Sequence, residues 1–139
     1  MNSLKQLVVV TIFAALACTG LYAQSLDMRA TIPFDFRAGN TLMPAGEYDI
    51  HSQGTWVILR LADGGRPVVG VMTNGATGGT SDREARLDFH RYGNAYFLTT
   101  IWSPFSRDGR QLPPTAREKE LAQKGRVPVE SAVVLASNK

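Results

Sequence analysis

Hydrophobic and polar residues alternate with a period of two in several short segments, and this pattern predicts β-strands. In the segment Thr31–Arg37 the alternation places Ile32, Phe34 and Phe36 on one face. Pro33 cannot donate a hydrogen bond to a neighbouring strand, so we expect this strand to lie at a sheet edge. Turn residues at 38–40 and 44–46 separate it from a second alternating strand at 47–51, with which we expect it to pair.

Three further regions have strand character. Residues 55–61 are apolar on both faces and predict a central strand, and residues 68–73 predict the next one. The glycine-rich segment 74–82 has no large apolar residue, so we expect a mobile loop. A phosphate-binding loop would need a following Gly-Lys-Ser/Thr and a strand-loop-helix context, and both are missing.

The segment 87–102 predicts a β-hairpin that turns at Gly93-Asn94. A strict two-residue turn would align Phe89 with Leu98, whereas a three-residue turn with a bulge would align it with Phe97. We prefer the second register, because it gives one clean apolar face with the Phe89 and Phe97 rings on the same side. We expect the other face to be covered by the carboxy-terminal segment rather than to line a groove; its residues would be Asp88, His90, Tyr96, Leu98 and Trp102.

Residues 103–114 predict a polar loop, and Thr115 with Glu118 three residues later matches a helix capping box. A short helix should run from Ala116 to Gln123 and stop near Gly125. The tail carries apolar residues at 127–129 and 132–135 that could add a last strand. The whole predicts a mainly β protein: a single antiparallel β-barrel or β-sandwich of about six to seven strands with one short C-terminal helix. Residues 30–102 would form the strand core, 115–124 the helix and 125–139 the tail.

The first 23 residues have a short basic start, an apolar run from Leu7 to Ala17 and a small residue, Ala23, before a polar one. This pattern is typical of a secretory signal peptide, with the mature chain beginning at Gln24 and located in the periplasm or outside the cell. A retained membrane anchor is the structural alternative, although the run is only about the minimum length for a bilayer. Lipidation at Cys18 is a third option.

Cleavage would leave residues 24–139, one domain of ordinary size. It would also remove Cys18, the only cysteine, so the domain would have no disulfide and no thiol nucleophile. The net charge of the full chain is +3, and its arginines are spread along the sequence. This distribution argues against a nucleic-acid partner, which requires basic residues concentrated on one face.

Several segments together resemble a group of small exported bacterial proteins that are abundant in acidobacterial genomes. The residues that carry the resemblance are Ile32-Pro33-Phe34-Asp35-Phe36, Ala38-Gly39, Leu42, Pro44-Ala45-Gly46-Glu47-Tyr48, Phe89-His90-Arg91-Tyr92-Gly93, Tyr96-Phe97-Leu98 and Trp102. The resemblance implies export and a single β-rich domain, and it assigns no catalytic or ligand-binding residue. Ala38 and Met43 depart from the group's pattern in ways that affect packing more than chemistry.

Two strands carry imidazoles and carboxylates at alternate positions. Glu47 and His51 share one strand face, as do Asp88 and His90 on another. If the two faces met, these four side chains could hold a divalent metal for a hydrolase or a cupin-like site. The simpler interpretation is that they are outward polar positions of half-buried strands, since the His-x-His grouping of barrel metal sites is missing. No cofactor is indicated.

Other catalytic chemistries find little support. The serines lie in no nucleophile-elbow pattern, and a paired-carboxylate glycosidase would need a deeper cleft than so small a domain builds. Arg91 could bind an anion through its planar guanidinium, or it could pair with a nearby carboxylate such as Asp88.

We therefore expect a binding or structural protein rather than an enzyme. Its partner would be another envelope protein or a small apolar or glycan ligand. Aromatic side chains with polar tips suit such a surface, although they could equally be core. A further option is assembly through the edge strand near Pro33. The candidate contact residues are Trp56, His90, Arg91, Tyr96 and Trp102.

Overall fold

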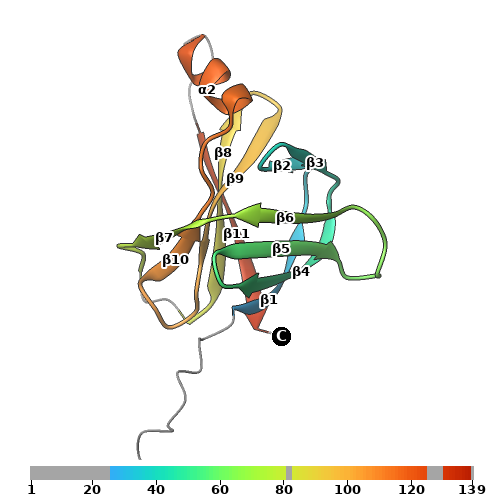
Figure 1. Ribbon diagram of the computed structural model, residues 1–139, viewed down its shortest axis with the longest axis vertical. Coiled ribbons are helices and arrows are strands. Elements are labelled where there is room, and N and C mark those ends of the chain that lie inside the picture. Colours follow the sequence, from blue (N-terminus) through green and yellow to red (C-terminus); the bar gives the residue numbers. More distant parts are fainter. Residues whose placement is uncertain (1–25, 81–82, 125–129, 139) are drawn as a thin grey trace, which may run out of the picture.

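The strands form one sheet that curls into a nearly closed barrel (Figure 1). The computed structural model describes residues 26–80, 83–124 and 130–138. Paired strands are antiparallel, apart from a single parallel bridge between β2 and β9. The elements are β1 (Asp27–Ile32), β2 (Phe36–Ala38), β3 (Thr41–Met43), β4 (Gly46–Gln53), β5 (Trp56–Leu61), β6 (Val68–Met72), β7 (Asn74–Thr77), β8 (Ala85–Tyr92), β9 (Ala95–Trp102), β10 (Asp108–Gln111), α2 (Ala116–Gln123) and β11 (Glu130–Asn138).

The strand order along the sheet is β3-β2-β9-β8-β11-β1-β4-β5-β6. The ring then returns to β9 through a sharp bend: β7 follows β6 after Thr73 alone, and β7 pairs with β10, which pairs with β9. Thr73 fixes this bend, because its N–H and its hydroxyl both donate to the carbonyl oxygen of Thr55 at 2.8 Å. The two ends of the order, β3 and β6, are not paired with each other.

The mainly β class and the barrel alternative are confirmed, but the sheet has 11 strands instead of six to seven. The predicted strand at 31–37 is two strands, β1 and β2. β1 pairs with β4, as expected, with Thr31 opposite Glu47. The edge prediction is wrong, because β1 also pairs with β11. Pro33 follows the last residue of β1, so it terminates the strand without occupying an edge.

Two segments expected to be loops contain strands. Residues 74–77 form β7 and residues 108–111 form β10, and they pair with each other. This pairing supplies hydrogen-bond partners along one edge of each segment, although neither has a large apolar residue to bury. The tail strand β11 is confirmed, and it lies in the middle of the sheet between β8 and β1. The apolar tail residues 127–129 lie outside the described residues.

Helix α2 has the predicted bounds, Ala116–Gln123, and Thr115 is its N-cap. The Thr115 hydroxyl accepts the backbone N–H of Glu118 at 3.2 Å, which is half of a capping box. The carboxylate of Glu118 bonds instead to side chains of β8 (described below). Gly125 lies outside the described residues, and Lys124 is the C-cap.

The register of the β8–β9 hairpin near its turn differs from our expectation. His90 pairs with Phe97, which places Phe97 on the face of His90 and opposite to that of Phe89. Phe89 packs in the barrel core, whereas the Phe97 ring contacts Tyr92 on the outer face, with 5.7 Å between ring centroids. The prediction that the Phe89 and Phe97 rings share a face is therefore wrong.

A β-bulge explains why the pattern was misleading. Thr99 has no partner on β8, so beyond it Leu87 pairs with Ile101, as the preferred register predicted. The Thr99 hydroxyl donates to the carbonyl oxygen of Asp88 at 2.9 Å, and the Thr99 carbonyl accepts the N–H of Leu112 at 2.8 Å. The hairpin thus has a strict two-residue turn at one end and the shifted register at the other.

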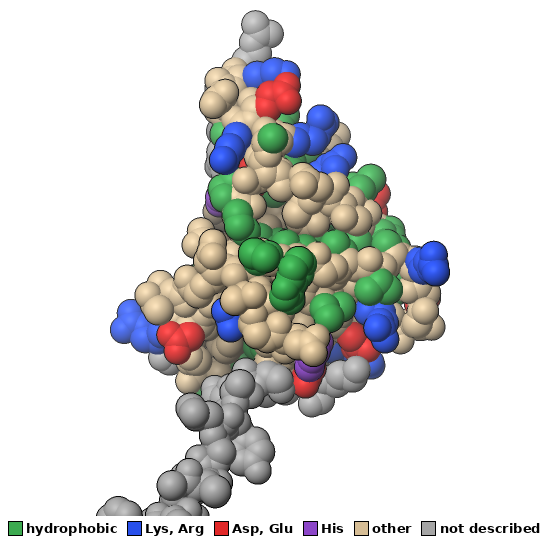
Figure 2. All heavy atoms as spheres, in the orientation of Figure 1, with side chains coloured by type: hydrophobic (Ala, Val, Ile, Leu, Met, Phe, Trp, Pro, Cys, Tyr) green, Lys and Arg blue, Asp and Glu red, His purple; other side chains and the backbone are tan. Residues whose placement is uncertain are grey.

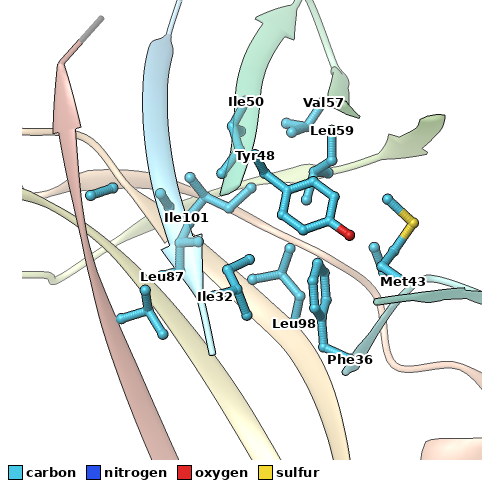
Figure 3. Close-up of a cluster of buried hydrophobic side chains, with 14 of the residues drawn as sticks. Ile32, Phe36, Met43, Tyr48, Ile50, Val57, Leu59, Leu87, Leu98 and Ile101 are labelled. Carbon is cyan, nitrogen blue, oxygen red and sulfur yellow. The ribbon is translucent and has the colours of Figure 1, made fainter. Parts of the chain in front are cut away.

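The core fills the barrel with large apolar side chains from nearly every strand (Figure 3). Tyr48 lies among them with its hydroxyl donating to the carbonyl oxygen of Pro44. Burial, and secondarily the Asp35 carboxylate, raise the pKa of Tyr48 above its usual value of 10.0. In the described ranges no helix has the length and apolar character that a bilayer crossing requires.

Candidate binding surface

Four apolar side chains form a strip across the outer face of β5 and β6. Trp56 lies opposite Met72, Ile58 opposite Gly70, and Val68 opposite Arg60. The exposed fractions are 47% for Trp56, 56% for Met72 and 48% for Val68, and Ile58 is half-buried. Figure 2 shows hydrophobic side chains gathered in the middle of this face, over β5 and β6. We call Trp56, Ile58, Val68 and Met72 the apolar strip.

The strip borders an unpaired sheet edge. Within the described part of the chain, β6 is hydrogen-bonded only to β5. The turn of the β2–β3 hairpin lies beside β6, since a Cβ placed at Gly39 would be 3.5 Å from a methyl group of Val71, but among the described residues no backbone hydrogen bond joins this hairpin to β6. An apolar strip beside an open edge suits a protein-binding surface, because side chains and backbone can both contact the partner.

The other predicted contact residues are engaged elsewhere. Trp102 lies on the outer face of β9, where its Nε1 donates to Asp88 Oδ2 at 2.6 Å. The Arg86 guanidinium lies 5.6 Å from the centroid of the Trp102 ring and pairs with the Asp88 carboxylate at 3.0 Å. Gly79 and Gly109 pack against the same indole, each with no room for a Cβ. Trp102 is thus an anchored, half-buried residue.

His90 is held by the helix. Its Nδ1 lies 2.9 Å from Oε1 of Glu118, and the Tyr92 hydroxyl donates to the same oxygen at 3.3 Å. A carboxylate only accepts hydrogen bonds, so Nδ1 of His90 carries the proton. Burial, then the charge of Glu118 and its hydrogen bond raise the pKa of Tyr92 above 10.0. The carboxy-terminal segment thus contacts this part of the outer face through Glu118, although the His90 side chain stays 44% exposed.

Tyr96 lies on the opposite side of the sheet from His90, because it pairs with Arg91. Its ring stacks on Phe34 with 3.8 Å between centroids. Arg91 pairs with Glu130 at 3.5 Å and donates to the carbonyl oxygen of Gly93 at 2.7 Å. The carboxylate that neutralises Arg91 is therefore Glu130 and not Asp88. We also expected Leu98 on the outer face, but it is part of the core.

The four residues of the metal hypothesis do not come together. Glu47 and His51 lie on β4 whereas Asp88 and His90 lie on β8, and strands β1 and β11 separate the two. The described residues contain no group of three or more His, Cys, Asp or Glu side chains that could hold a metal ion.

The residues of β4 that face outward have local partners on β1. Glu47 and Asp49 both contact Arg29, and the Asp49 hydrogen bond raises the pKa of Arg29. His51 pairs with Asp27. This is the arrangement that outward polar positions of half-buried strands predict.

A shallow depression beside the β3–β4 turn is the candidate site for a small ligand. Its volume is about 560 Å³, and no aromatic residue lines it. Its two carboxylates have partners, Glu47 with Arg29 and Asp63 with the N–H of Gly65. Small-ligand sites usually combine apolar walls with a few convergent polar groups, so this depression is a weaker candidate than the strip.

Sequence reasoning found Trp56 but missed its partners Val68 and Met72. The available signal was the run Val68-Val69-Gly70-Val71-Met72, which places apolar residues on both faces of the strand. Such a run is typical of a strand buried on both faces, and only the topology reveals that β6 ends the strand order with one face open.

No protein-family model, characterised protein or solved structure gives a match to this chain.

Proposed function

We propose that this protein is an exported binding domain of the bacterial envelope, which docks another polypeptide through the apolar strip. The observation that carries the proposal is the exposure of Trp56, Val68 and Met72 beside the open edge of β6. Leaving such side chains in water costs roughly 25 cal/mol per Å² of apolar area that a partner would bury. A surface of this kind on a monomer usually marks a contact site.

The strip is favoured over the other exposed apolar pair, Val133 and Leu135. Those side chains project from β11, which pairs with β8 along residues 130–136 and with β1 at residues 136–138. They lie opposite the charged residues Asp88 and Arg86 of β8, so an apolar partner there would also have to desolvate charged groups. The strip has no charged residue among its four members, and it lies beside the unpaired edge of β6.

A photo-crosslinking amino acid placed at position 56 tests this proposal in the cells that produce the protein. We expect a discrete crosslinked product from position 56 and none from the control position 133, whose side chain is exposed to a similar degree (57%). No product at position 56, or equal products at both positions, would reject the strip as the contact surface.

Export follows from the amino-terminal pattern of residues 1–23 and has its own test. We expect the mature protein to begin at Gln24 and to be recovered from the periplasm or the medium. Amino-terminal sequencing of the purified protein measures this directly. A chain that keeps Met1 and fractionates with the cytoplasm would overturn the proposed location.

A further inference from the structure

The outer edge of β6 has its backbone groups aimed away from the barrel. The N–H of Thr73 donates to the carbonyl oxygen of Thr55, the residue before β5, so the backbone groups of Thr73 point toward the β5 side of the sheet. In an antiparallel pair the direction alternates from residue to residue. The N–H and C=O groups of Val68, Gly70 and Met72 therefore point toward the open edge, where no described residue is paired with them.

The apolar pattern of β6 is symmetric about Gly70, with an exposed apolar residue two positions away on each side. If a second β6 approached in the antiparallel direction with the two Gly70 residues opposite each other, Val68 of each copy would face Met72 of the other. Both are exposed apolar residues on the same outer face. The pairing would form about six main-chain hydrogen bonds and join the two apolar strips into one surface.

Two features favour a second copy over an unrelated strand. β6 has no charged residue or proline, which are the usual protections of an edge strand, so identical strands approach without charge repulsion. In addition, the Trp56 ring lies over Gly70, with 3.8 Å to a Cβ placed there. Glycine keeps side chains away from the symmetry axis, and a Cβ there would make only ordinary van der Waals contact with the indole.

We propose that the protein forms a two-fold symmetric dimer by antiparallel pairing of β6 with β6 of a second copy, centred on Gly70. This inference rests on the proposed role of the strip and names its occupant. A five-residue strand pair with one apolar strip is smaller than a standard stable interface of about 1,600 Å². We therefore expect a dissociation constant on the order of micromolar.

Sedimentation velocity of the protein as purified from the producing cells measures the association from about 1 to about 100 µM. We expect a concentration-dependent monomer–dimer equilibrium. Val68→Lys with Met72→Lys places like charges opposite each other across the axis and should weaken the dimer at least tenfold. The matched control, Val133→Lys with Leu135→Lys, adds the same charge to similarly exposed positions of β11 and should leave the dimer unchanged.

Two further variants test the register. Val68→Glu with Met72→Lys places opposite charges against each other and should restore dimerisation in a salt-sensitive form. Gly70→Cys should form an intermolecular disulfide on oxidation, since Cα atoms of a hydrogen-bonded pair lie about 5.5 Å apart. Val133→Cys should not. The Gly70→Cys test needs no change of charge, so it holds even if the double-lysine variant fails to fold.

The outcomes separate this inference from the proposed function. A protein that stays monomeric at every concentration, or whose dimer ignores the lysine pair at positions 68 and 72, overturns the β6 dimer. If position 56 still crosslinks to a different polypeptide in that case, the proposed function stands with another partner. Crosslinking of position 56 to a second copy supports both.

Discussion

The contact between α2 and the barrel leads to a quantitative prediction about Glu118. Its side chain is almost fully buried, with 9% exposed, and Oε1 accepts hydrogen bonds from His90 and Tyr92. Glu118→Ala removes both interactions and leaves the Tyr92 hydroxyl without this acceptor. The helix would lose its polar contacts to β8, although the N-cap hydroxyl of Thr115 would remain.

The expected magnitude follows from the exposure of the two donors. A hydrogen bond to a charged group contributes about 1.5–3 kcal/mol when it is shielded from water. The His90 side chain is 44% exposed, so water replaces part of its bond, whereas Tyr92 is buried. We therefore expect Glu118→Ala to lower the free energy of unfolding by about 2–3 kcal/mol and Glu118→Gln, which keeps an acceptor oxygen, by about 1 kcal/mol.

Urea denaturation at neutral pH, followed by circular dichroism, measures these changes. The matched control is Glu120→Ala on the same helix, because Glu120 pairs only with exposed Lys124 at 2.9 Å among the described contacts. An exposed pair four residues apart contributes about 0.5 kcal/mol or less. If Glu118→Ala and Glu120→Ala lose equal stability, the His90–Glu118–Tyr92 contact does not hold the helix on the sheet and the reasoning fails.

Two other predictions concern the packing of Trp102 and the ionisation of Tyr92. A Cβ at Gly79 would lie 2.6 Å from the Trp102 ring, so Gly79→Ala should lower the free energy of unfolding, measured by heat or urea, by about 1–3 kcal/mol. The control Gly75→Ala has open space around it and should be nearly neutral. Equal effects of the two substitutions would refute the close packing. Because the pKa of Tyr92 is raised in the folded state, its contribution to stability is complete below about pH 10 and is lost as the pH rises through the folded pKa. Tyr92→Phe should therefore show a smaller fall in unfolding free energy above pH 10, and identical pH profiles would contradict the shift.

The local patterns of the sequence were enough to predict the elements whose signals are local. Alternation identified the β1–β4 pairing, and Thr115 with Glu118 located the helix to the residue. The β7–β10 pair could not be predicted this way, since neither strand has apolar alternation and each depends on a partner about 30 residues away. Such strands form only because they pair with a distant segment, and local sequence does not show which segment that is.

The candidate site was harder to predict, because exposure depends on topology. Among the aromatic residues predicted to make contacts, Trp56 is exposed whereas Tyr96 and Trp102 are half-buried. The Thr99 bulge displaced Tyr96 and Phe97 from their expected faces. A bulge adds one residue without any compositional signal, and it inverts every side chain on one side of it. His90 was expected under the carboxy-terminal segment, but its specific partner, Glu118, was assigned only a capping role.

The central position of β11 sets the order in which this protein can fold. β11 leaves the ribosome after every other described strand, yet it supplies the hydrogen bonds between β8 and β1. A nascent chain that ends before residue 130 has a gap between β8 and β1, so the barrel cannot close before β11 has been made. If the leader pattern directs export during synthesis, we expect this dependence to delay closure of the barrel until the last strand has been made.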